Sequence, residues 1–154
     1  MKPAVLILLA FLVGLGGYFA FQSWPPSLGK FANMLPLQSE SNCFLQQQAC
    51  LATAGQAQVH LRLAPQPVPL MKPIQAFLQV KGLNDLETIT LKVEGLNMYM
   101  GFQEVQLSKQ TDTKWEGSFS LPICSETEMH WRVTTNLKTK QQGYQADFNL
   151  VTQR

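Results

Sequence analysis

Charged residues are scarce in this chain of 154 residues: they make up 14% of it, and the formal net charge is only +2. A nucleic-acid-binding domain normally carries a concentrated basic face, so this composition argues against that class. The chain is not expected to be disordered, because 45% of its residues are hydrophobic. Its length suits one domain rather than two.

Enzyme motifs are also absent. Of the two histidines, His60 and His130, neither lies in a pattern that suggests a nucleophile and its base. No phosphate-binding Gly-rich loop, nucleophile elbow, HExxH or CxxC motif occurs. We therefore expect no enzymatic activity.

The N-terminus contains one long uncharged run, from Ala4 to Phe21, which approaches the thickness of a bilayer as a helix. The alternative is a cleaved signal peptide, but cleavage after Ala20 would put the bulky Tyr18 at the minus-three position. We predict an uncleaved transmembrane anchor over residues 1–23. Lys2 would remain in the cytoplasm, which makes this a single-pass inner-membrane protein with its C-terminal domain in the periplasm.

Only three cysteines are present, Cys43, Cys50 and Cys124. In an oxidising compartment two of them should pair, and Cys43 with Cys50 is the simplest choice. Cys124 is then the odd thiol, which is explained either by burial as a small hydrophobic residue or by a function. A disulfide from Cys124 to Cys43 or to Cys50 remains open.

Residues 24–54 carry no clear period, and we expect a linker followed by a cystine-closed turn. Residues 55–154 alternate between hydrophobic and polar residues, which is typical of half-buried strands. One apolar face per strand predicts an all-β, immunoglobulin-like antiparallel β-sandwich, with a small closed barrel as the alternative. The seven expected strands lie around residues 59–63, 74–80, 89–93, 105–107, 115–121, 129–137 and 144–150.

The stretch EGLNMYMGF, residues 94–102, departs from the strand pattern. Met98 and Met100 share a phase, so an extended backbone would place both thioethers on one side. Soft sulfur ligands select Cu(I) over hard cations. Cys124 lies in another turn, followed by Met129 and His130. If the two turns meet at one end of the sandwich, these five residues could enclose a copper ion.

A metal-free role is the alternative. Met129 is in phase with neighbouring apolar residues and suits a core position. Tyr99 and Phe102, next to the two methionines, could instead form a surface that contacts a protein partner in the envelope.

The segments Asn97–Phe102 and Trp115–Trp131 resemble small exported sandwich proteins related to the YtkA-like and FixH-like families. In these families a single membrane span precedes an immunoglobulin-like domain with an M-x-M-G loop and a Leu-Pro-x-Cys turn. The resemblance implies copper supply or assembly of respiratory oxidases, with the inner membrane and an oxidase or its assembly factors as partners. The positions that match the family pattern are Met98, Met100, Gly101, Cys124 and Met129.

Overall fold

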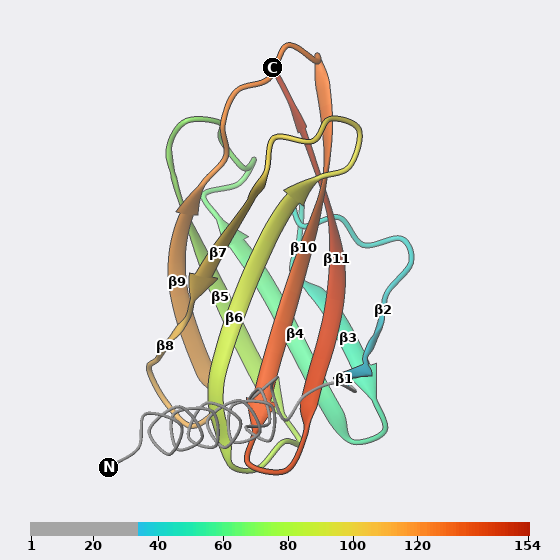
Figure 1. Cartoon of the computed structure of the whole chain (residues 1–154), viewed down its shortest axis with the longest axis vertical. Helices are drawn as coiled ribbons and strands as arrows, with labels where there is room; N and C mark the ends of the chain where they lie inside the picture. The colour runs from blue at the N-terminus through green and yellow to red at the C-terminus, as the bar shows by residue number, and fades with distance from the viewer. Residues whose placement is uncertain (1–33) are drawn as a thin grey trace, which may run out of the picture. The chain divides into compact units, whose positions relative to one another are not determined.

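The structure, a computed structural model, describes residues 34–154, and every helix or strand in that range is a β-strand. The strands are β1 (Met34–Pro36), β2 (Gln38–Ser39), β3 (Cys50–Ala54), β4 (Ala57–Ala64), β5 (Pro73–Lys81), β6 (Leu86–Gly95), β7 (Phe102–Gln106), β8 (Ser108–Lys109), β9 (Lys114–Ser120), β10 (Glu128–Thr139) and β11 (Gly143–Gln153). Sheet A has the order β1-β11-β10-β6-β7 and sheet B the order β2-β3-β4-β5-β9-β8 (Figure 1). Among the named strands, only β1 and β11 pair in parallel.

The predicted all-β fold with two sheets is confirmed. All seven expected strands are present, as β4, β5, β6, β7, β9, β10 and β11. The four others are short, and the longest of them, β3, lies in the region that we expected to be a linker. Its buried side chains, Cys50 and Ala52, are too small to give a clear hydrophobic period.

The predicted membrane anchor, residues 1–23, lies outside the described residues. Within residues 34–154, no helix is long and apolar enough to span a membrane.

Alternation along β10 shows how the two sheets share one core. Met129, Trp131 and Val133 are buried, whereas His130 and Arg132 are exposed on the other face of sheet A. Consecutive side chains of a strand point to opposite faces, so the hydrophobic period places every second residue in the core.

The two sheets are joined by a strand that changes sheets. Leu107 donates its backbone N–H to the carbonyl oxygen of Ile89 in sheet A (2.8 Å). The next residue, Ser108, pairs with Glu116 of sheet B. Gly117 permits this crossing, because a Cβ atom there would lie 2.5 Å from Cδ2 of Leu107. On this side of the sandwich, the chain from β7 to β8 therefore passes directly from sheet A to sheet B.

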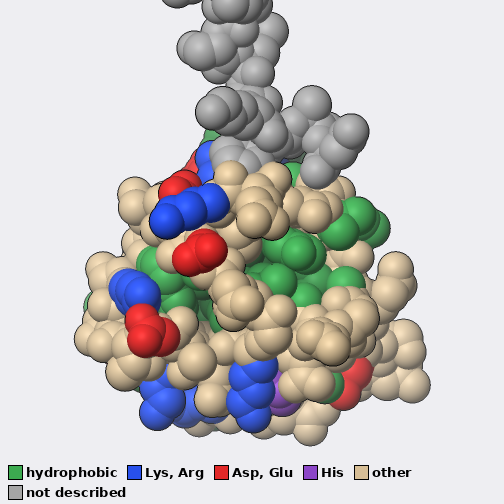
Figure 2. All heavy atoms as spheres, turned by 90° about the horizontal axis from the view of Figure 1, so that it is seen from below, with side chains coloured by type: hydrophobic (Ala, Val, Ile, Leu, Met, Phe, Trp, Pro, Cys, Tyr) green, Lys and Arg blue, Asp and Glu red, His purple; other side chains and the backbone are tan. Residues whose placement is uncertain are grey.

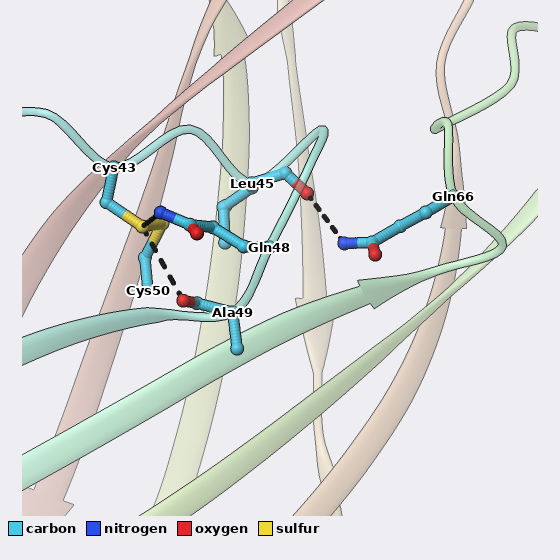
Figure 3. Close-up of a disulfide and its surroundings, with 6 residues drawn as sticks. All are labelled: Cys43, Leu45, Gln48, Ala49, Cys50 and Gln66. Atoms are coloured by element: carbon cyan, nitrogen blue, oxygen red, sulfur yellow. Dashed lines mark hydrogen bonds between the residues drawn. A yellow bond between two sulfur atoms is a disulfide. The ribbon is translucent and has the colours of Figure 1, made fainter.

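The predicted disulfide between Cys43 and Cys50 is confirmed, with 5.6 Å between the two Cα atoms (Figure 3). Leu45, within the closed loop, is fully buried in the core. Its carbonyl oxygen accepts a hydrogen bond from Nε2 of Gln66 (3.3 Å), and its N–H donates to the carbonyl oxygen of Asn149 (3.0 Å). The cystine loop is thus packed onto the sandwich.

Three loops lie at the upper end of the sandwich in Figure 1, beside the C-terminus. They are the β4–β5 loop (65–72), the β6–β7 loop (96–101) and the β9–β10 loop (121–127), and we call this the loop end. The opposite end carries the β5–β6 and β10–β11 connections. There, basic and acidic side chains are mixed around a hydrophobic area, and neither sign of charge dominates (Figure 2).

Candidate functional site

The β6–β7 loop is fixed onto the first residues of β10. Leu96 donates its N–H to the carbonyl oxygen of His130 (2.8 Å). The Asn97 side chain continues this pattern, since its Nδ2 donates to the carbonyl oxygen of Glu128 (2.9 Å) and its Oδ1 accepts from the N–H of His130 (3.0 Å). The Asn97 side-chain amide thus makes the two hydrogen bonds to β10 that the backbone of a paired strand would make. It sets the position of Met98, the next residue.

Met98 and Cys124 meet at the loop end. The Cys124 thiol donates a hydrogen bond to Sδ of Met98, and the two sulfur atoms are 3.0 Å apart. Cys124 is free and only 8% exposed, and Met98 is partly buried against the core. Two of the predicted ligands are therefore brought together by loops 26 residues apart.

Met129 lies close to the same loop from the core side. Its Cε lies 3.1 Å from the position that a Cβ atom of residue 95 would take, and the carbonyl oxygen of Met98 lies 2.5 Å from that position. Gly95 therefore makes room for both the loop and the Met129 side chain. Met129 is 3% exposed, so its thioether is held in the hydrophobic interior beside the Met98 backbone.

Met100 is placed differently. It is 36% exposed and lines a cavity of about 40 Å³ together with Val93 and Trp131. The expectation that Met98 and Met100 extend side by side assumed a strand, but residues 96–101 form an irregular loop. The Met100 side chain therefore lines this cavity and is not a partner in the Cys124–Met98 hydrogen bond.

His130 lies on the outer face of sheet A, whereas Met129 faces the core. Its Nε2 is 2.9 Å from Oε1 of Glu128, whose other oxygen accepts a hydrogen bond from Gln153 (3.0 Å). These bonds, that from Gln153 foremost, lower the pKa of the Glu128 carboxyl below its ordinary value. His130 thus belongs to an exposed polar network and points away from the core-side sulfur of Met129.

The loop end also exposes most of the large hydrophobic side chains found at the surface of residues 34–154. Tyr99 is 79% exposed and Phe102 56% exposed, and Nζ of Lys92 lies 4.8 Å above the Phe102 ring. Of eight such exposed side chains, six belong to this end: Leu96, Tyr99, Met100, Phe102, Ile123 and Met71. We call these six the apolar rim.

Two kinds of sulfur group occur at this site. The Cys124 thiol and the Met98 thioether are in contact, and the Met129 side chain, the second thioether, has its Cε near Gly95 beside the Met98 backbone. A thiolate from Cys124 and neutral thioethers from Met98 and Met129 would form a soft donor set. Ligands about 2.3 Å from a metal and at about 120° to each other are roughly 4 Å apart. The 3.0 Å pair would therefore open by about 1 Å, with loss of the thiol proton, to admit an ion. Within residues 34–154, no three His, Cys, Asp or Glu side chains gather in a way that would hold a metal without methionine.

Sequence reasoning missed the role of Asn97, and it expected Gly95 only to let the loop bend, not to make room for Met98 and Met129. Their signals were weak: glycine and asparagine are common in any loop. Only the pairing of the β6–β7 loop with β10 gives them a role.

No protein family, no curated protein and no solved structure matches this chain.

Proposed function

We propose that this protein binds one Cu(I) ion at the loop end through Met98, Cys124 and Met129. The observation that carries the proposal is the contact of 3.0 Å between the Cys124 and Met98 sulfur atoms. Thiolate and thioether ligands favour Cu(I), whereas sites for Zn²⁺ are built from thiolate, imidazole and carboxylate ligands. Met100 and His130, the other two predicted ligands, lie outside this set of three.

The cellular setting is part of the proposal. The disulfide between Cys43 and Cys50 favours an oxidising compartment. Together with the uncharged run from Ala4 to Phe21, it supports a periplasmic domain tethered to the inner membrane. We assign the sandwich to the immunoglobulin-like type. The resemblance of Asn97–Phe102 and Trp115–Trp131 to YtkA-like and FixH-like proteins points to an accessory role in respiratory oxidase assembly.

The test is a Cu(I) titration of the purified full chain, without oxygen and in competition with a chromophoric chelator. Met98→Leu keeps the volume and removes the sulfur, and Cys124→Ser removes the thiolate. Each should lower the Cu(I) affinity by more than about tenfold. Met71→Leu is the matched control, because Met71 is exposed on a neighbouring loop and outside the sulfur set.

Two results would reject the copper site. One is a parent chain that does not compete with the chelator. The other is a set of variants in which Met98→Leu, Cys124→Ser and Met71→Leu all bind as the parent does. Urea unfolding of each variant shows whether a loss of affinity reflects a loss of fold.

The apolar rim favours a second candidate, a metal-free interaction module. Contiguous exposed hydrophobic side chains commonly mark protein-binding surfaces. Tyr99→Ser should then abolish cross-linking to oxidase assembly proteins in membranes, while Cu(I) affinity stays unchanged. If the parent chain binds no copper, and the Tyr99→Ser variant no longer cross-links to the partner, the result supports the interaction module in place of the copper site.

A further inference from the structure

The side of the sandwich where β7 lies next to β9 is open beyond the strand that changes sheets. A shallow, open groove of about 440 Å³ lies there, lined by Pro73, Gln103, Glu104, Val105, Ser118, Phe119 and Ser120. Gln103 pairs with the buried Val93 and so has the phase of a core residue, yet it is exposed. At Gln103, the face of β7 that has the phase of the core is therefore exposed to solvent.

One wall of the groove is the free edge of β7. The bond from Leu107 N–H to the carbonyl oxygen of Ile89 sets the alternation of hydrogen-bonded and non-bonded pairs between β7 and β6. By that alternation Gln103 bonds to β6, whereas Phe102 and Glu104 direct their N–H and C=O groups away from it. Among the described strands, β6 is the only partner of β7.

The other wall is an edge of β9. The N–H of Val80 donates to the carbonyl oxygen of Thr113 (2.8 Å), which fixes the alternation between β5 and β9. Phe119 therefore bonds to β5, while Ser118 and Ser120 direct their backbone groups outward. β8 covers this edge only near its start and does not reach Ser118.

The two edges would pair with each other if β7 continued in sheet B. Extending the register of Ser108 with Glu116 would set Glu104 opposite Ser120. Instead, β7 belongs to sheet A, so Glu104 and Ser120 line one groove without a strand between them. Backbone donors and acceptors thus face the groove from both sides.

We propose that this groove binds an extended peptide segment of a partner protein, which adds a strand to β7. An extended backbone has alternating donors and acceptors along both of its edges, and it is the ligand that matches two strand edges. Inward side chains of the peptide would cover Val105, which is half-buried against the core, so apolar, β-branched residues are expected there. A basic residue is expected opposite Glu104 on the outer face. The site does not depend on copper binding.

The probe is a library of random heptapeptides displayed on phage and selected on the immobilised full chain. Selected peptides are synthesised with a fluorescent label, and their affinities are measured by anisotropy. Glu104→Pro removes the N–H that faces the groove at an edge position where proline is tolerated. It should lower the affinity about tenfold or more. Glu104→Ala keeps the N–H, and it should change the peptide affinity by no more than about threefold.

A second measurement does not rely on the fold of Glu104→Pro. N-methylation of the peptide at the residues that bond to β7 should abolish binding, and methylation at the alternate residues should not. The proposal is overturned if no peptide is enriched, if both Glu104 variants bind equally, or if the free edge instead pairs two copies of the chain in a dimer that Glu104→Pro dissociates. Glu104→Pro should leave Cu(I) affinity unchanged, so failure of either proposal is seen separately.

Discussion

Replacing Gly95 by alanine should destabilise the domain and weaken the sulfur site together. The new Cβ would lie 2.5 Å from the carbonyl oxygen of Met98 and 3.1 Å from Cε of Met129. A carbon–oxygen contact of about 3.3 Å is normal, so the loop would move by about 0.8 Å. Overpacking of this kind costs about 1–3 kcal/mol, partly offset by about 0.4–1 kcal/mol from the stiffer unfolded chain.

The assay is urea unfolding combined with the chelator competition for Cu(I). For a domain of this size the expected loss lowers Tm by about 3–10 °C, and the Cu(I) affinity should fall as the loop leaves Cys124. Gly55→Ala is the control: Gly55 has φ +58° and nothing within 4 Å of the added Cβ. It should cost about 1–2 kcal/mol through backbone strain and leave Cu(I) binding unchanged. A Gly95→Ala protein with the parent's stability and affinity would refute the reasoning.

Three further predictions concern the supports of the site and the fold. Asn97→Ala removes two hydrogen bonds to β10, so Cu(I) affinity should fall about tenfold and loop amides should exchange faster by mass spectrometry. Replacing Cys43 and Cys50 by alanine should lower the free energy of unfolding in urea by about 2–3 kcal/mol, because the unfolded chain is no longer cross-linked. The hydrogen bond from Gln153, chiefly, lowers the pKa of the Glu128 carboxyl in the folded state. The ionised carboxylate therefore stabilises the folded protein at neutral pH, and this contribution is lost as the pH falls through the folded-state pKa. Tm should therefore fall less steeply towards acid pH in Glu128→Gln than in the parent.

The strands and the disulfide were predictable because both depend on short-range patterns. Alternation identified the seven longer strands and placed Met129 on the core face. The seven-residue spacing of Cys43 and Cys50 favoured the pair that forms. The turns that carry Met98 and Cys124 do meet, which the copper hypothesis required as a condition, since both join strands at the same end of the sandwich.

The remaining features depend on contacts between distant segments. Nothing local in the sequence marks Leu107 as the point where a strand changes sheets, because the crossing depends on Gly117 of β9. The Asn97 side chain acts as a strand backbone only once β10 lies beside it. Met100 was expected beside Met98, but the irregular loop between Gly95 and Phe102 separates their environments.

X-ray absorption at the copper edge tests the proposed site most directly. The full chain is loaded with one Cu(I) without oxygen, and the first coordination shell is measured for the parent and for Met129→Leu. The proposal predicts a shell of sulfur atoms alone, at about 2.3 Å, that loses one sulfur in the variant. A shell containing nitrogen, as coordination by His130 would give, or one unchanged by Met129→Leu, would contradict it.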